Sequence, residues 1–274
     1  MIKIGSDIAN LPLADFRFFL YEYISYICRA LKHEFMRKLV IIPTYNEKEN
    51  ISAMIDKVLS LPEEFDMLII DDGSPDGTAE IVRRRISNEQ CRLHLIERSG
   101  KLGLGTAYIT GFKWALDNGY DYIFEMDCDF SHNPDDLTRL YHAALDGADV
   151  VVGSRYITGV NVVNWPMSRL LMSYYASRYV HAVTRMPVRD ATAGFVCYSR
   201  EVLERIDLDK IKMKGYGFQI EMKYTAWKLG FSIKEVSIIF VERTQGTSKM
   251  SSGIFGEAFW GVLGLRFRTI KGRR

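Results

Sequence analysis

Short apolar runs alternate with helical patterns from Lys38 onward. Apolar runs without strict polar alternation are typical of strands that are buried on both faces of a sheet. The predicted strands are residues 39–42, 67–70, 93–96, 122–126 and 150–152. Helical patterns between them include residues 50–61, 78–86 and 106–116. Strand and helix in alternation predict an α/β fold, a βαβ series with a mostly parallel sheet and helices on both faces.

Polar or glycine-rich clusters follow each of these predicted strands. They occupy residues 43–47, 71–78, 101–105, 127–129 and 153–156. Ligands of open parallel sheets bind beyond the carboxyl ends of the strands. We therefore expect the functional residues in these clusters.

Two carboxylates, Asp127 and Asp129, follow the fourth strand at positions i and i+2. Their side chains leave on the same face if the strand geometry continues. Carboxylates on one face repel each other unless a cation lies between them, and a hard divalent ion such as Mg²⁺ or Mn²⁺ also holds substrate phosphates. The alternative is a solvated acidic loop. The position directly after an apolar strand favours the metal site.

A second carboxylate pair, Asp71 and Asp72, follows the second strand. The Ser-Pro-Asp-Gly sequence at 74–77 predicts a turn, and Asp76 or Thr78 is expected to cap the next helix. Only one of two consecutive strand-end carboxylates can face the core or a neighbouring helix. The other is expected to accept hydrogen bonds from a base or a ribose.

The glycine-rich segment after the third strand argues against two nucleotide-binding classes. Gly100, Gly103 and Gly105 do not form the GxGxxG fingerprint, and the chain has no GxxxxGK[ST] loop. This speaks against a nicotinamide dehydrogenase and a P-loop NTPase. With Lys101, these glycines form either a loop that a ligand approaches closely or only the flexible start of the next helix.

The second half of the chain supplies cations beside small polar residues. Arg155 lies in Gly-Ser-Arg-Tyr, Arg169 lies four residues before Ser173, and Arg243 lies six before Lys249. A guanidinium makes paired contacts to phosphate oxygens, and an ammonium supplies a compact charge. Arg169 and Ser173 are an i, i+4 pair on a predicted helix and can converge on one anion. Solvated arginines are the usual case, but an acidic metal site opposite several cations predicts chemistry between two phosphorylated molecules.

Composition narrows the class of protein further. Lys and Arg number 36 against 34 Asp and Glu, a net charge of +2, and 47% of residues are hydrophobic, which excludes disorder and argues against a nucleic-acid partner. Four well-separated cysteines without a CxxC pair indicate a reducing compartment. No segment reaches the about 18 uncharged apolar residues that cross a bilayer. Because neither end resembles a cleaved signal peptide, we expect a cytoplasmic protein.

The motifs PTYNE, DDGSPDGT, KLGLGTAY, DCDFSH, GSRY, DATAGF and RTQGTSK occur in this order over about residues 38–249. This set resembles the family 2 glycosyltransferases of the GT-A (Rossmann-like) fold, and most of all the members that act on polyprenyl phosphates. The resemblance implies an inverting transfer of mannose from GDP-mannose to a polyprenyl (dolichyl) phosphate. The alternative within this class is transfer of glucose or a modified sugar from a UDP donor. The intact Asp-Cys-Asp and the cations argue against a non-catalytic binding module, and GSRY and RTQGTSK fit a nucleotidyltransferase poorly.

The resemblance also implies roles for the motif residues. The nucleoside of the donor would be held by Pro43, Tyr45, Glu47, Ile70 and Asp72. The diphosphate and a Mg²⁺ or Mn²⁺ ion would be lined by Asp127, Cys128 and Asp129, with Asp127, Asp129 and, more weakly, Ser131 as metal ligands. Other phosphate contacts of the donor would come from Arg155, Arg243 and Lys249, and those of the acceptor phosphate from Arg155, Arg169 and Ser173. The catalytic set would be Asp127, Asp129 and Arg155.

Three positions qualify this assignment. Cys128 stands where alanine is common in the family. Ser131 stands where some relatives present a glutamine, so water can replace this shorter ligand, and His132 is expected to be structural.

The attacking phosphate monoester is already anionic, so the mechanism requires positioning and charge stabilisation rather than a strong general base.

The predicted catalytic domain, residues 36–250, is flanked by residues 1–35 and 251–274. At the C-terminal end one helical face is apolar and a basic end follows; the apolar positions are Ile254, Phe255, Ala258, Phe259, Val262 and Leu263. Such a helix binds an anionic membrane surface or packs on the domain. Residues 16–31 carry a second apolar stripe, which is another anchoring element or precedes a later start at Met36. A lipid-linked acceptor favours peripheral attachment to the cytoplasmic face of a membrane, through these helices or a small membrane anchor protein.

Overall fold

The structure is a computed structural model that describes residues 36–87, 92–213, 215–242 and 254–272. The chain divides into two units, Met1–Met36 and Arg37–Arg274. The second unit holds the fold and the candidate site. The predicted stripe at residues 16–31 lies outside the described residues.

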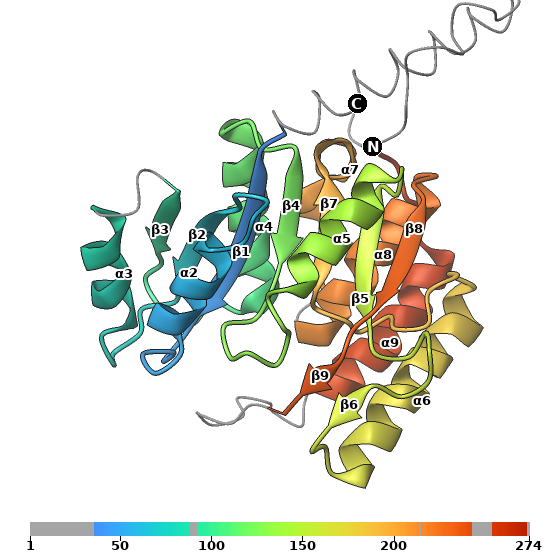
Figure 1. Ribbon diagram of the computed structural model, residues 1–274. Coiled ribbons are helices and arrows are strands. Elements are labelled where there is room, and N and C mark those ends of the chain that lie inside the picture. Colours follow the sequence, from blue (N-terminus) through green and yellow to red (C-terminus); the bar gives the residue numbers. More distant parts are fainter. Residues whose placement is uncertain (1–35, 88–91, 214, 243–253, 273–274) are drawn as a thin grey trace, which may run out of the picture. The chain divides into compact units, whose positions relative to one another are not determined.

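A seven-stranded sheet forms the centre of this unit, in the order β3-β2-β1-β4-β7-β5-β8 (Figure 1). Its strands are β1 (Lys38–Thr44), β2 (Asp66–Asp71), β3 (Leu93–Glu97), β4 (Tyr122–Glu125), β5 (Val150–Ser154), β7 (Val196–Ser199) and β8 (Ile233–Ser237). Only β7 runs antiparallel to its neighbours, β4 and β5. The five predicted strands are therefore confirmed, and so is the mostly parallel α/β sheet.

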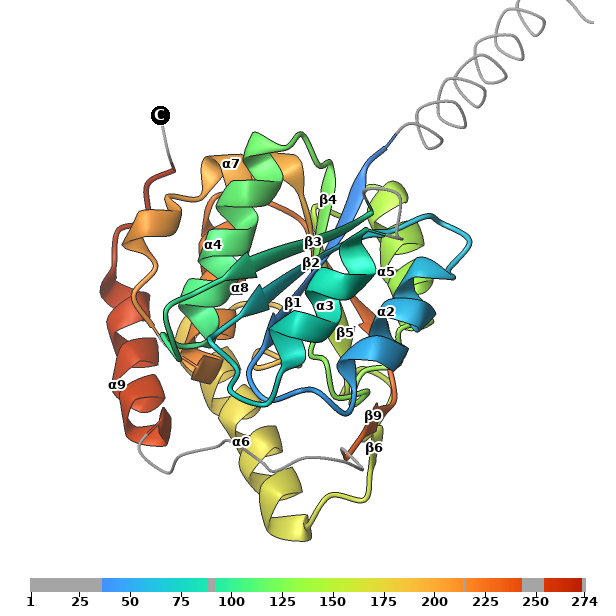
Figure 2. The same cartoon turned by 90° about the vertical axis from the view of Figure 1, so that its left-hand side faces the viewer.

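Helices cover both faces of the sheet, as predicted (Figure 2). On one face lie α2 (Ile51–Leu59), α3 (Thr78–Ile86) and α5 (Asp136–Leu145). On the other lie α4 (Leu104–Asp117), α7 (Arg200–Arg205) and α8 (Gly215–Lys228), and a 3₁₀ turn, η2, spans Leu208–Lys210. The helical patterns at 50–61, 78–86 and 106–116 correspond to α2, α3 and α4.

The continuous apolar runs of the strands are explained by two separate cores. In β1, Val40 and Ile42 pack into the core under α2 and α5, whereas Leu39 and Ile41 pack into the core under α4. Both sets are fully buried. Because a Cβ on Gly111 would lie 2.8 Å from Ile41 Cγ2, the close approach of α4 to β1 requires a glycine there.

Two further helices, α6 (Met167–Thr184) and α9 (Ile254–Phe267), pack beside α8 around a third apolar core. Val262 of α9 is 1% exposed and contacts this core with Val180 and Ile220. The C-terminal helix thus packs on the domain through part of its predicted apolar face, while Trp260 lies 72% exposed. Among the described residues, no helix has the length and apolar character needed to cross a membrane.

A two-stranded parallel sheet, β6 (Val162–Val163) with β9 (Phe240–Val241), lies beyond the carboxyl ends of β5 and β8 (Figure 1). His132, from the loop after β4, bridges to Phe240 of this small sheet. The carboxyl ends of the main strands therefore face a compartment bounded by α6, α8 and the small sheet.

Candidate active site

The loops after β1 and β2 are fastened to each other. Three backbone N–H groups of the first loop donate to side chains of the second: Asn46 to Ser74 Oγ (2.9 Å), Glu47 to Thr78 Oγ1 (3.0 Å) and Lys48 to Asp76 Oδ2 (3.1 Å). Asp76 Oδ1 also accepts from the N–H of Thr78, at the start of α3. The N-cap residue of α3 is Gly77 rather than Asp76 or Thr78, but Asp76 satisfies the first N–H of the helix, and the turn holds the 43–47 loop in place.

The paired carboxylates after β2 have different surroundings. Asp71 is 1% exposed and accepts hydrogen bonds from Thr44 Oγ1 (2.9 Å) and from the N–H and Oγ of Ser74. Asp72 Oδ1 accepts from Arg98 Nε at 2.6 Å. Asp71 is therefore the inward-facing carboxylate that the sequence predicts, whereas the second, Asp72, is held by a guanidinium. A contact between Asp72 and a ribose stays a prediction.

The other predicted nucleoside residues lie at the same edge of the sheet. Pro43 and Ile70 stand opposite each other in the register of β1 and β2. The Nζ of Lys101 lies 5.1 Å from the centre of the Tyr45 ring, and Glu47 begins the turn into α2. The glycine-rich loop therefore contributes Lys101 to this edge.

A small polar pocket of about 90 Å³ lies beyond β4 and contains Asp127, Asp129 and Ser131. The chain turns at Phe130, whose φ of 57° is left-handed, and the Ser131 N–H donates to Asp129 Oδ1 at 3.0 Å. Ser131 is 2% exposed, and its Oγ has no hydrogen-bond partner within the described part of the chain. The turn after β4 thus gathers the three predicted metal ligands in one pocket.

These oxygen donors suit a hard divalent cation. The described residues contain no group of three or more His, Cys, Asp or Glu side chains placed to hold a metal. A Mg²⁺ or Mn²⁺ ion at Asp127 and Asp129 therefore fits only if water and substrate oxygens complete its coordination, which is common for Mg²⁺.

Two neighbours of this turn are packed inside the protein. Cys128 is buried, with 3% of its surface exposed. His132 lies between the rings of Phe195 and Phe240, with both centroid distances 5.1 Å. Burial lowers the pKa of His132 to about 4, so the imidazole is neutral at pH 7. This agrees with a structural role.

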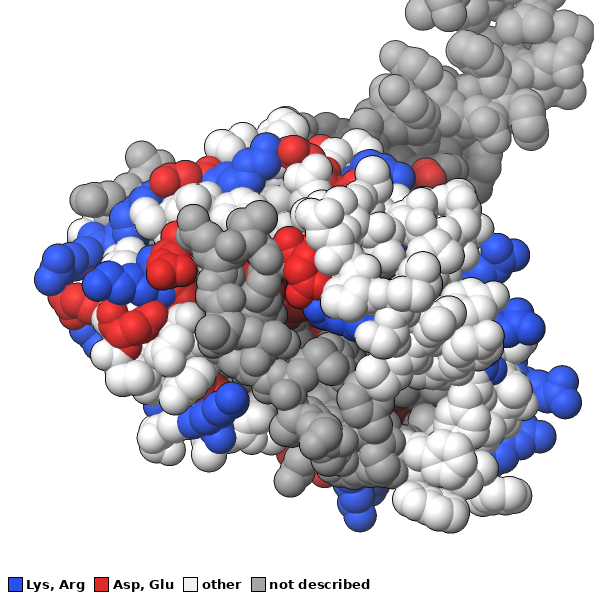
Figure 3. Space-filling view, turned by 90° about the horizontal axis from the view of Figure 1, so that it is seen from below, with Lys and Arg blue, Asp and Glu red and all other residues white. Residues whose placement is uncertain are grey.

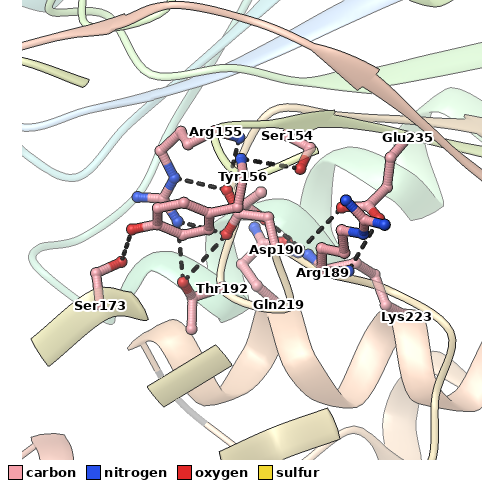
Figure 4. A network of polar contacts seen from close by, with 11 residues as sticks. Ser154, Arg155, Tyr156, Ser173, Arg189, Asp190, Thr192, Gln219, Lys223 and Glu235 are labelled. Carbon is pink, nitrogen blue, oxygen red and sulfur yellow. Dashed lines mark hydrogen bonds and ion pairs between the residues drawn. The ribbon is translucent and has the colours of Figure 1, made fainter. Parts of the chain in front are cut away.

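Arg155 forms a buried ion pair at the wall of the polar pocket (Figure 4). Its Nε and Nη2 donate to the two carboxylate oxygens of Asp190 at 2.7 and 2.6 Å, and Nη2 also donates to Thr192 Oγ1. Burial opposes both charges, but the paired charges and hydrogen bonds raise the pKa of Arg155 and lower that of Asp190. The pair is therefore ionised, and Asp190 balances the charge of Arg155.

A larger, mostly apolar cavity of about 430 Å³ lies between α6, α8 and α9. Its apolar walls include Ala176, Val180, Ile220 and Val262. It shares one wall with the polar pocket, formed by Arg155, Trp165, Arg169, Thr192 and Tyr216. The two cavities therefore meet at two guanidinium groups.

Arg169 and Ser173 both line the apolar cavity. Arg169 Nη1 donates to Glu242 Oε1 at 2.5 Å, and its guanidinium stacks 4.3 Å from the Trp165 ring. Ser173 Oγ accepts from the hydroxyl of Tyr156 at 2.8 Å. The structure brings the pair to one wall, and their joint binding of a phosphate stays a prediction. The two other predicted phosphate ligands, Arg243 and Lys249, lie outside the described residues.

A buried polar group that we did not predict lies beneath the polar pocket. Lys223, with no exposed surface, donates from Nζ to Ala193 O at 2.6 Å and to Gln219 Oε1 at 3.4 Å. Burial raises the pKa of Glu125 and lowers that of Lys223, and their mutual attraction opposes both shifts. Three features of the sequence could have indicated this buried polar group. They are a glutamate, Glu125, inside an apolar strand, the pair Gln219 and Lys223 at positions i and i+4, and Asp190 in the 190–195 motif.

The mostly parallel sheet, with paired carboxylates beyond the carboxyl end of β4, has the arrangement of the GT-A fold. Residues 39–207 match the family model described as glycosyl transferase family 2. The chain belongs to this family and is a glycosyltransferase.

Two relatives are similar over most of the chain. The chain is 45% identical over 233 residues to a "Polyprenol monophosphomannose synthase" of Mycolicibacterium smegmatis, covering 83% of this chain and 88% of that one. It is also 45% identical over 243 residues to an "Undecaprenyl-phosphate mannosyltransferase" of Micrococcus luteus, covering 87% and 99%. Among solved structures, glucosyl-3-phosphoglycerate synthase of Mycobacterium tuberculosis in complex with UDP superposes with a TM-score of 0.61 at 19% identity, covering 85% and 80%. That likeness shows the fold.

Proposed function

We propose that this glycosyltransferase moves mannose from GDP-mannose to a polyprenyl phosphate, with inversion at the anomeric carbon. The observation that carries the proposal is the junction at Arg155 and Arg169 of a polar pocket with a mostly apolar cavity. The names of the two relatives support the sugar and the lipid class.

The donor occupies the edge of the sheet from β2 to β4. Its nucleoside lies at the fastened loops that hold Tyr45, Glu47 and Asp72. Its diphosphate lies at Asp127 and Asp129, where a Mg²⁺ or Mn²⁺ ion, when bound, neutralises charge on the leaving diphosphate. A solved relative of this fold was crystallised with Mn²⁺ and UDP.

The acceptor extends from the shared wall into the apolar cavity. Its isoprenoid chain packs against the aliphatic side chains of α6, α8 and α9, where burial of each CH₂ contributes about 0.8 kcal/mol. Its phosphate lies near Arg169 and Ser173. Because Glu242 holds Arg169 in the described structure, we expect the phosphate to compete with this carboxylate.

The chemistry requires alignment more than proton transfer. A phosphate oxygen of the acceptor forms a bond to the anomeric carbon as the bond from that carbon to the diphosphate breaks. The acceptor is anionic near pH 7, so no side chain has to remove a proton. Asp190 holds Arg155 in place and balances its charge. Arg155 lies between the two anionic substrates and favours their close approach. Because the ion pair has no net charge, it does not bind either substrate too tightly.

The mouth of the apolar cavity fits attachment to a membrane surface. Met172, Tyr175 and Phe259 line the cavity and are 44%, 64% and 46% exposed. Leu171 and Trp260 extend this exposed apolar rim. Figure 3 shows a broad area of uncharged residues on this side, bordered by Lys and Arg. The exposed rim allows a lipid to enter from a bilayer without crossing water.

A transfer assay tests the proposal. The protein is incubated with Mg²⁺ or Mn²⁺, a polyprenyl phosphate and either labelled GDP-mannose or labelled UDP-glucose, and the lipid phase is extracted. We expect label in the lipid from GDP-mannose. Label from UDP-glucose alone would contradict the proposed donor, and label from neither would contradict the proposed reaction.

A further inference from the structure

The buried amide of Gln219 forms part of the polar pocket, yet no role in the proposed reaction accounts for it. Gln219 is 1% exposed and projects from α8 on the side of Asp190 and Thr192 (Figure 4). Its Nε2 has no hydrogen-bond partner among the described residues. A buried amide nitrogen without a partner is unfavourable, so such groups call for an explanation.

The contact with Lys223 determines how the amide is oriented. The ammonium group of Lys223 only donates, and it lies 3.4 Å from Gln219 Oε1 and 2.6 Å from Ala193 O. The oxygen of the amide is therefore on the side of Lys223, and Nε2 is at the other corner. This assignment follows from the chemistry of the neighbour rather than from the amide itself.

The two N–H groups of Nε2 point in different directions. One side of the amide faces the carboxyl group of Glu125, and this contact opposes the rise that burial causes in the pKa of that group. A Cβ on Gly194 would lie 3.8 Å from Nε2, so the absence of a side chain there leaves that side of the amide open. One N–H can therefore face Glu125 while the other faces the pocket.

The backbone that carries Gln219 is held on both sides. The preceding residue, Phe218, stacks on Tyr108 of α4 with an interplanar angle of 9°. Glu221 accepts the N–H groups of Lys212 and Met213 before α8 begins. The amide therefore has a fixed position, as a group that selects a ligand requires.

We propose that Gln219 recognises the sugar of the donor, with Nε2 donating a hydrogen bond to one hydroxyl oxygen of the hexose in the polar pocket. This inference rests on the proposed function, because that function places a nucleotide sugar there. The ligand atom is a sugar hydroxyl rather than a phosphate oxygen, since the cationic Arg155 and the acidic turn lie at the other walls of the same pocket. Lys223 acts as a positioning residue through its bond to Oε1.

The experiment uses Gln219→Met, which keeps the length of the side chain and removes the amide. Transfer is measured with whichever of GDP-mannose and UDP-glucose the wild type uses, and with its monodeoxy analogues. We expect kcat/KM to fall about 10-fold for the intact donor. We expect the variant to lose the penalty that the wild type shows for one particular deoxy analogue. The affinity of the free nucleoside diphosphate should not change.

Two control variants make the result decisive. Gln219→Asn retracts the amide with little loss of polarity, and it should reproduce the effect if the methionine variant does not fold. Thr225→Val removes a buried hydroxyl from the same helix away from the pocket and should leave transfer unchanged. An equal loss of affinity for the nucleoside diphosphate, or an unchanged penalty for every deoxy analogue, would overturn the assignment.

The failure of this inference is separable from that of the proposed function. Use of UDP-glucose alone by the wild type contradicts GDP-mannose as donor, while Gln219 is still tested with UDP-glucose. No transfer from either donor by the wild type overturns both proposals.

Discussion

The two cavities share a wall but are constructed differently. The polar pocket, about 90 Å³, forms at the ends of strands, where turns carry Asp127, Asp129 and Thr192. The apolar cavity, about 430 Å³, forms between helices far apart in the sequence, α6, α8 and α9. The turns at the strand ends hold each polar side chain of the first pocket in a defined position. The packing of the three helices determines the volume of the apolar cavity.

The two cavities therefore differ in the interactions that hold their side chains in place. In the polar pocket, each charge is oriented by a partner, as Asp190 orients Arg155. The walls of the apolar cavity are mostly aliphatic and aromatic side chains, whose packing is not directional. Changes at strand ends should therefore affect chemistry or folding steeply, and changes in the cavity should affect only acceptor binding.

The largest expected effect comes from Asp190→Asn, which breaks the shared wall. Removing one member of a buried ion pair leaves Arg155 without compensation, which costs about 3–5 kcal/mol of unfolding free energy. Urea denaturation at pH 7 measures the loss. The control is Asp209→Asn, whose side chain is 78% exposed and pairs with Lys113, and which should change stability by less than about 0.5 kcal/mol. Equal losses in the two variants would show that the buried pair has no special role.

The difference in unfolding free energy between the wild type and Asp190→Asn should depend on pH. The pKa of Asp190 is lower in the folded than in the unfolded protein, so the unfolded state binds the proton more readily. The stabilisation is complete above the ordinary aspartate pKa of about 4 and is lost as pH falls through the folded value. The gap between wild type and Asp190→Asn should therefore narrow below about pH 4. A gap that widened in acid would contradict the direction of the shift.

Asp129→Asn should disable the polar pocket and leave the apolar one intact. Loss of one charged ligand beside the leaving diphosphate is expected to lower kcat about 10²–10³-fold, because charge that develops in the transition state is no longer stabilised. Polyprenyl phosphate binding, measured with a fluorescent acceptor, should be unchanged. Asp135→Asn, an exposed partner of Lys57, serves as the control. A near-normal kcat of Asp129→Asn at saturating metal would contradict the proposed role of Asp129 as a metal ligand.

The polar half could be predicted from sequence because its signals are local. Apolar runs defined β1 to β5, and the carboxylates follow these strands directly in the chain. The pairing of Arg155 with Asp190 joins residues 35 positions apart, so no local pattern contains it. The antiparallel strand β7 enters the sheet between β4 and β5, and its short run, residues 196–199, gave no sign of that position.

The apolar half could not be predicted because a cavity depends on packing between distant helices. The face of α9 shows why. Helical spacing grouped Phe259 with Val262, but Phe259 is 46% exposed at the mouth of the cavity and Val262 is buried in the third core. Periodicity gives the face of a helix, and only the neighbouring helices decide which part of that face remains exposed.

Ala176→Phe should narrow the apolar cavity without altering the polar pocket. Ala176 lines the cavity, and a ring in its place would displace part of the isoprenoid chain, so KM for a long polyprenyl phosphate should rise about 10-fold. KM for the donor should not change. Steady-state transfer with a long-chain and a short-chain acceptor measures the effect, which should be smaller for the short chain. The control, Ala182→Phe, adds a ring to the solvent-exposed part of α6. Equal effects of the two variants would exclude this cavity as the lipid site.

Ser173→Ala should have the smallest effect and tests whether the apolar cavity, next to the shared wall, binds the acceptor phosphate. Ser173 Oγ accepts from Tyr156 Oη, so its own proton is directed to another acceptor. If that acceptor is the phosphate, the variant should raise the KM of the lipid about 2–10-fold, the value of one hydrogen bond, and leave the KM of the donor unchanged. Ser168→Ala, at an exposed position of the same helix, should have no effect. If the KM of the donor rose instead, Ser173 would belong to the polar pocket and the division between the two cavities would have to be redrawn.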